Sequence, residues 1–141
     1  AIMGGDTLTK IDVEEGHKVV KSIPVGSNPR HVVLTSDGSM LYVSNNAPGT
    51  VTQVDVSKDR AVGTIKVGRQ PRTIALSPSG NTLYVCNYES GCLGVIDLNR
   101  QQQTYTLPTR VHPIGATVSP DGRTVWVSSY RTSTIHVFRY P

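Results

Sequence analysis

One segment recurs three times along this chain at a fixed spacing of 42 residues. It occupies residues 27–46, 69–88 and 111–130, and the repeated positions include Pro29, Pro71 and Pro113 as well as Gly38, Gly80 and Gly122. A sequence period near 42 is typical of stacked supersecondary units, each of which buries its apolar face against its neighbours. The whole chain is therefore expected to be one repeat array.

Each repeat contains four short segments that are typical of β-strands. The first is mostly apolar and is expected near 31–35, 73–77 and 115–119, followed each time by a turn with a glycine that can adopt a positive φ. The second is rich in aromatic and β-branched residues, and two further segments follow it. No window places apolar residues at helical spacing. Four strands in about 40 residues indicate a β-propeller blade.

The expected fold is all-β, a β-propeller of four-stranded blades in an incomplete ring. The predicted units are a partial blade at 1–26, blades at 27–68 and 69–110, and a partial blade at 111–141, with 13 strands in all. Propellers close with about four to eight blades. We therefore expect residues 1–10 and 134–140 to lie against protein outside this arc. The ring would be completed either by the remaining blades of a longer protein or by further copies of this chain.

The second segment of each repeat carries a recognisable tetrad. Tyr-Val-Ser-Asn at 42–45 and Tyr-Val-Cys-Asn at 84–87 resemble the YVTN-type β-propeller repeat, whereas the third copy departs from it with Trp-Val-Ser-Ser at 126–129. The resemblance covers nearly the whole chain and implies the propeller fold. Relatives of this repeat include surface-layer proteins, periplasmic proteins, lactonase-like enzymes and propeller subunits of redox enzymes. The resemblance therefore does not fix an activity.

The two cysteines flank a predicted hairpin turn. Cys86 ends a second strand and Cys92 begins a third, and we expect their side chains to face each other at a distance that suits a disulfide. A disulfide would imply an oxidising compartment, so the chain is expected to be exported to the periplasm, the cell surface or the medium. The alternative is two reduced thiols in a niche that Ser and Thr fill in the other copies. A six-residue spacing without a nearby His or Cys does not favour a zinc site.

Basic residues gather on one face of the predicted propeller. This top face is formed by the loops before each first strand and between each second and third strand, and it carries five arginines against one glutamate. Ligands of propellers usually bind at the channel mouth, and convergent guanidinium groups favour carboxylate or phosphate ligands. The alternative is that the arginines pair with acids of neighbouring blades or are solvated. The predicted ligand-binding residues are Arg30, His31, Arg69, Arg72, Arg110 and His112.

No catalytic constellation, metal-ligand set or cofactor motif is recognisable in the sequence. Only Asn87 and Glu89 could contribute to a lactonase-like metal site, and the four histidines do not cluster. Haem-attachment, P-loop and dinucleotide-binding motifs are missing, as is an apolar run long enough to span a membrane. The small basic excess and the few aromatic residues do not favour nucleic-acid binding.

Two functions are consistent with these features. We expect a non-catalytic scaffold without a cofactor, which binds a partner or a small anionic ligand at the channel mouth. The alternative is part of a propeller enzyme, lactonase-like or redox, whose active site is completed by blades outside this chain.

Overall fold

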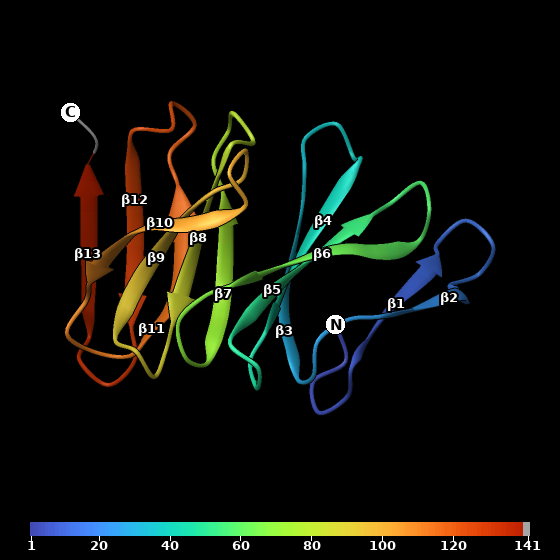
Figure 1. Cartoon of the computed structure of the whole chain (residues 1–141), viewed down its shortest axis with the longest axis horizontal. Helices are drawn as coiled ribbons and strands as arrows, with labels where there is room; N and C mark the ends of the chain where they lie inside the picture. The colour runs from blue at the N-terminus through green and yellow to red at the C-terminus, as the bar shows by residue number, and fades with distance from the viewer. Residues whose placement is uncertain (140–141) are drawn as a thin grey trace.

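The computed structural model describes residues 1–139, and in them the chain forms thirteen β-strands and no helix (Figure 1). This confirms the predicted all-β propeller fold. The strands are β1 (Thr7–Asp12), β2 (Lys18–Pro24), β3 (Pro29–Leu34), β4 (Met40–Asn45), β5 (Thr50–Asp55), β6 (Arg60–Lys66), β7 (Pro71–Leu76), β8 (Thr82–Asn87), β9 (Cys92–Asp97), β10 (Gln102–Pro108), β11 (Pro113–Val118), β12 (Thr124–Ser129) and β13 (Thr134–Arg139). The last strand was expected to reach Tyr140, which lies outside the described residues.

The strands form four antiparallel sheets, each of which is a blade or part of one. Two sheets are complete, with the orders β3-β4-β5-β6 and β7-β8-β9-β10. The other two are the pair β1-β2, which we call the half-blade, and the three-stranded sheet β11-β12-β13, which we call the end blade. The sheets follow one another across the molecule in chain order (Figure 1). Within residues 1–139 the chain is therefore an arc of a propeller rather than a closed ring.

The first strand of each blade lies on the inner side of the arc. Strand β7 packs against β3 on one side and β11 on the other. Two side-chain hydrogen bonds join neighbouring blades. The Ser44 hydroxyl donates to the carbonyl of Arg72, and the Thr73 hydroxyl donates to the carbonyl of Ile114. The first strands are therefore innermost, as predicted, although each begins two residues earlier than expected, at the repeated proline.

The turn between the first and second strands has the same geometry in three blades. Gly38, Gly80 and Gly122 have φ values of 73°, 74° and 73°, which is the left-handed region that favours glycine. In the first of these turns, Asp37 accepts hydrogen bonds from the Thr35 hydroxyl at 2.6 Å and the Ser39 amide at 3.0 Å. These bonds favour the ionised carboxylate, and they lower the pKa of Asp37 to about 2.

The apolar core lies between neighbouring sheets. One cluster joins the two complete blades and includes Val51, Ile65 and Leu83, all buried. A second joins the second complete blade to the end blade, and a third joins the half-blade to the first complete blade. Each complete blade therefore packs against a neighbouring sheet on both faces, whereas the half-blade and the end blade each have one uncovered face within the described arc.

Cys86 and Cys92 are both free and buried, so the predicted disulfide is not formed. The register pairs Cys92 with Asn87 and Cys86 with Leu93, one residue away from the alignment that we expected. Because successive side chains of a strand point to opposite faces, this offset places the two thiols on opposite sides of the blade. Burial raises the pKa of Cys86 to about 12 and also raises that of Cys92, so both thiols are kept protonated.

A buried asparagine at the end of the second strand packs against a glycine in the loop before the first strand. A β-carbon at the glycine would lie 2.6 Å from the asparagine side chain in both complete blades. In the end blade, Ser129 stands in place of the asparagine and Arg110 in place of the glycine. The blade that lacks the glycine therefore has a smaller side chain at the asparagine position. The glycine–asparagine pairs are Gly26 with Asn45 and Gly68 with Asn87.

Candidate functional site

Three top-face residues from two blades form a stack at the inner rim of the arc. Arg72 lies at the start of β7, Tyr88 directly follows β8, and His112 directly precedes β11. The guanidinium carbon of Arg72 lies 3.7 Å from the centroid of the Tyr88 ring. The His112 ring stacks on Tyr88 with centroids 4.4 Å apart and an interplanar angle of 18°. At these distances the guanidinium and the imidazole occupy opposite faces of the tyrosine ring.

Backbone contacts of the repeat hold this stack in place. The Tyr88 amide donates to the carbonyl of Gln70 at 3.1 Å, which fixes the loop after β8 against the loop before β7. His112 Nδ1 lies 2.9 Å from the carbonyl oxygen of Tyr88. Because a carbonyl oxygen can only accept, Nδ1 of His112 is the donor in this contact. The stack therefore presents a cationic donor beside an imidazole whose Nδ1 is already hydrogen-bonded.

The stack continues toward the end blade. The Tyr130 amide donates to the carbonyl of His112 at 2.8 Å, and the Tyr130 ring lies 6.3 Å from the Tyr88 ring at an angle of 49°. The guanidinium of Arg131 lies 5.6 Å from the centroid of Tyr130. Tyr88 and Tyr130, which occupy the same position of the repeat, thus each make a cation–π contact with an arginine. Contacts of this kind favour a fixed orientation of the guanidinium group.

Arg72 has no acidic partner in the described part of the chain. The ion pairs found there join Lys10 to Asp59, Lys58 to Asp55 and Arg100 to Asp97. Nε of Arg72 is buried and has no hydrogen-bond partner among the described residues, and the same is true of Arg30 in the preceding blade. The pairing of these arginines with acids of neighbouring blades, which was the alternative interpretation, is not found in residues 1–139.

Of the six predicted residues, only Arg72 and His112 meet in the stack. Arg30 contacts the sulfur of Met3, and His31 Nδ1 accepts a hydrogen bond from the amide of Ile74 at 3.4 Å. Desolvation by burial lowers the pKa of His31. Arg69 and Arg110 are exposed, and no contact between their side chains and the stack is found in the described residues.

Tyr88 is the central residue of the stack, and it is not among the ligand-binding residues predicted from the sequence. The signal was present, because Tyr88 and Tyr130 occupy the same position of the repeat, directly after the second strand. That position is bonded to the loop that precedes the first strand of the same blade. An aromatic residue there can therefore reach the arginine at the start of the innermost strand.

The described residues contain no group of three or more His, Cys, Asp or Glu side chains that could hold a metal ion. Asn87 was one of two residues considered as ligands of a lactonase-like metal site. Its side chain is fully buried and donates a hydrogen bond to the Cys92 sulfur at 3.8 Å. In residues 1–139 no helix is long and apolar enough to cross a membrane.

The four consecutive antiparallel sheets place the chain among β-propellers. Residues 31–110, which are more than half of the chain, match the family model described as lactonase, 7-bladed beta-propeller. The chain therefore belongs to this family of propellers. A comparison with curated protein sequences finds no match.

Three solved structures share the arrangement of strands. Hydrazine synthase of Kuenenia stuttgartiensis is 27% identical with a TM-score of 0.88 over 95% of this chain and 40% of that one. A protein of Bacteroides fragilis NCTC 9343, with an attributed 6-phosphogluconolactonase activity, is 22% identical with a TM-score of 0.78 over 94% and 44%. Dihydro-heme d1 dehydrogenase NirN, in complex with DHE, is 18% identical with a TM-score of 0.71 over 96% and 33%. The chain thus spans less than half the length of each of them.

Proposed function

We propose that this chain forms one arc of a closed propeller and binds a small anionic ligand at the channel mouth through Arg72. The observation that supports this most directly is a guanidinium stacked on Tyr88 without a carboxylate partner in residues 1–139. A stacked guanidinium keeps its N–H edge available, and carboxylates and phosphates accept two parallel hydrogen bonds from such an edge. His112 stacks on the opposite face of Tyr88 and limits the movement of that ring.

Tyr88 lowers the cost of binding in this proposal. An exposed arginine has many rotamers, and ordering it on binding costs about 0.5–1.5 kcal/mol. The 3.7 Å contact with the tyrosine ring orders the guanidinium before a ligand arrives. Tyr88 is therefore a positioning residue, whereas Arg72 is the residue that contacts the anion.

The biological role then takes one of two forms. The match to the lactonase propeller family and the similarity to structures of enzymes favour part of an enzyme, lactonase-like or redox, whose catalytic groups lie on blades outside this chain. The second form is a scaffold that binds its ligand without chemical change. Membership of the YVTN-type subgroup and export from the cytoplasm also stay predictions. The argument for export was a disulfide between Cys86 and Cys92, and both cysteines are free in the structure.

The site can be tested on this chain by calorimetric titration with pyrophosphate and, separately, with citrate. Arg72→Ala should weaken binding by about tenfold or more, because a hydrogen bond to a charged group contributes about 1.5–3 kcal/mol. The double variant Arg30→Ala/Arg72→Ala should bind more weakly still and with less salt dependence. Tyr88→Leu, which keeps every charge, should show a smaller loss.

The matched control is Arg69→Ala, which removes one top-face charge outside the stack. Its effect should be small and should disappear at high salt, because an exposed charge is screened. Equal losses for Arg69→Ala and Arg72→Ala would show that only the net charge matters, and the proposed site would then be wrong.

A further inference from the structure

Two histidines lie at the start of an innermost strand, and they use Nδ1 in opposite ways. His112 Nδ1 donates to the carbonyl of Tyr88 at 2.9 Å, whereas His31 Nδ1 accepts from the amide of Ile74 at 3.4 Å. An imidazolium ring carries a proton on both nitrogens. Protonation of His31 therefore removes its contact with Ile74, while protonation of His112 leaves its contact with Tyr88 in place. Of the two, only His112 can gain a charge and keep its hydrogen bond.

The nitrogen of His112 that gains this proton is Nε2, because Nδ1 is already the donor. In residues 1–139 Nε2 has no hydrogen-bond partner, and it is not one of the buried atoms without a partner, so solvent reaches it. The ring is stacked on Tyr88 with centroids 4.4 Å apart, and the face of an aromatic ring attracts a cation. The charged form of His112 is therefore compatible with the stack as it stands.

The charges around His112 are mostly positive. No ion pair of residues 1–139 includes any of the titratable or charged side chains that surround it. A positive charge gained by His112 is therefore not neutralised by a carboxylate, and it repels the guanidinium on the other face of Tyr88. These surrounding side chains are Arg72 of β7, Tyr88 and Glu89 of the loop after β8, Tyr130 and Arg131 of the loop after β12, and Arg110 of the segment before β11.

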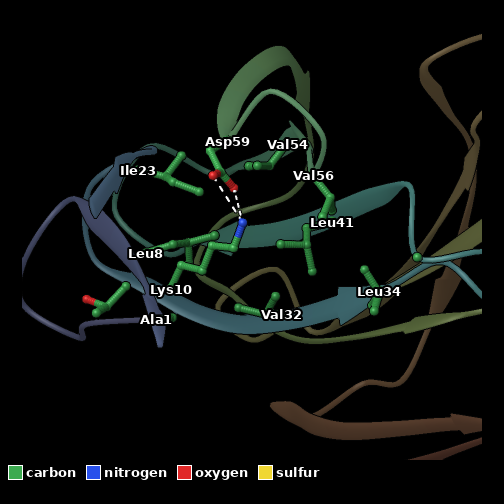
Figure 2. Close-up of a pocket in the computed structure, with 12 residues that line it drawn as sticks. Ala1, Leu8, Lys10, Ile23, Val32, Leu34, Leu41, Val54, Val56 and Asp59 are labelled. Carbon is green, nitrogen blue, oxygen red and sulfur yellow. Dashed lines mark hydrogen bonds and ion pairs between the residues drawn. The ribbon is translucent and has the colours of Figure 1, made fainter. Parts of the chain in front are cut away.

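The apolar pocket between the half-blade and the first complete blade differs from the stack in this respect. It has a volume of about 380 Å³, and the charged side chains that line it are Lys10 and Asp59. These two are paired with each other at 2.9 Å (Figure 2). Their charges compensate, whereas the charges at the stack do not. An anion whose binding depends on protonation is therefore expected at the stack and not in this pocket.

We infer that His112 is a second, proton-dependent contributor to the anion site, which rests on the proposed function of Arg72. When Nε2 is protonated, the stack has a positive charge on each face of Tyr88, at 3.7 Å and 4.4 Å from the ring centroid. An anion bound to the Arg72 guanidinium is then attracted by both charges, and a divalent anion gains more than a monovalent one. The coupling is reciprocal, so binding of the anion is accompanied by uptake of a proton.

The test is calorimetric titration of the whole chain with sulfate, whose own charge is constant over the range in which histidine titrates. At low ionic strength, sulfate should bind about fivefold more tightly near pH 5.5 than near pH 8. His112→Asn retains an N–H donor for the Tyr88 carbonyl but cannot be protonated, so its affinity should be the same at both pH values. The matched controls are His31→Asn and Glu89→Gln, which should both retain the pH dependence of the original chain.

A second measurement needs no variant. Titrations of the original chain near pH 6.5, in two buffers of different ionisation enthalpy, should show that protons are taken up when sulfate binds. Failure of the proposed function is recognised separately, because Arg72→Ala would then leave sulfate binding unchanged. If Arg72→Ala weakens binding but no proton is taken up, the anion site stands and the inference about His112 is overturned. PH dependence that persists in His112→Asn, or that disappears in either control, would overturn it too.

Discussion

Strands β9 and β13 occupy the same position in their blades and differ in what covers them. Leu93 on β9 is fully buried, whereas its equivalent Ile135 on β13 is 65% exposed. The half-blade gives the same contrast, since Ile11 is 50% exposed and its equivalent Ile96 is fully buried. Each pair has similar apolar side chains and similar strand geometry. Burial in this molecule is therefore determined by the neighbouring blades on both sides and not by the strand alone.

This comparison predicts the largest difference between two similar truncations. Leu93→Ala should lower the free energy of unfolding by about 2–5 kcal/mol, because it leaves a cavity between two blades. Ile135→Ala should change it by less than about 0.5 kcal/mol, as expected for an exposed site. Urea unfolding measures both. Equal losses would show that β13 is covered in solution and that the arc is not open there.

The glycine–asparagine pair distinguishes a complete blade from the end blade by a smaller amount. Gly68→Ala places a β-carbon 2.6 Å from the Asn87 side chain, and overpacking of this kind costs about 1–3 kcal/mol. Asn87→Ser, which introduces the residue of the end blade, should make room for it. The double variant should therefore be less destabilised than the sum of the two single variants. Additive losses in urea unfolding would contradict the packing explanation.

The turns allow a comparison that depends on pH. Asp37 has a pKa of about 2 in the folded chain against an ordinary value of 3.8, so it stabilises the fold fully above pH 4 or so and this contribution is lost as the pH falls toward 2. Asp37→Ser introduces the residue that the next blade has at Ser79. The variant should be less stable than the original chain at pH 7, and the difference should shrink toward pH 2. A difference independent of pH would exclude the carboxylate as its cause.

The smallest effect is expected at the ion pair that joins the half-blade to its neighbour. Lys10 Nζ lies 2.9 Å from Asp59, and both side chains are partly exposed. Lys10→Met should lower the free energy of unfolding by less than about 1 kcal/mol, and high salt should remove the difference. Lys58→Met, which breaks an ion pair within one turn, is the matched control. A loss well above 1 kcal/mol for Lys10→Met alone would show that the half-blade depends on this contact.

The repeat made the fold predictable. Proline and glycine at fixed positions define where strands begin and turns occur, and the 42-residue period gives the number of blades, so thirteen strands could be expected. The hairpin register could not be read at single-residue accuracy, and a one-residue error was enough to pair Cys86 with Cys92 wrongly. The rim site was predicted in part, because the position of Arg72 follows from the repeat whereas its stacking on Tyr88 depends on how two loops of one blade meet.

The packing of glycine against asparagine also limits how such blades can be duplicated and exchanged. Gly26 precedes the segment 27–68 that contains its partner Asn45, and Gly68 likewise precedes the partner of Asn87. A genetic cassette that begins at residue 27 or 69 separates the two members of each pair. If a second copy of residues 69–110 were inserted directly after Arg110, Arg110 would take the place of Gly68 next to the Asn87 of the inserted copy. The packing of that asparagine leaves no room for a side chain there. Recombination between such propellers should therefore conserve breakpoints before the glycine, so that each cassette carries both residues of its own pair.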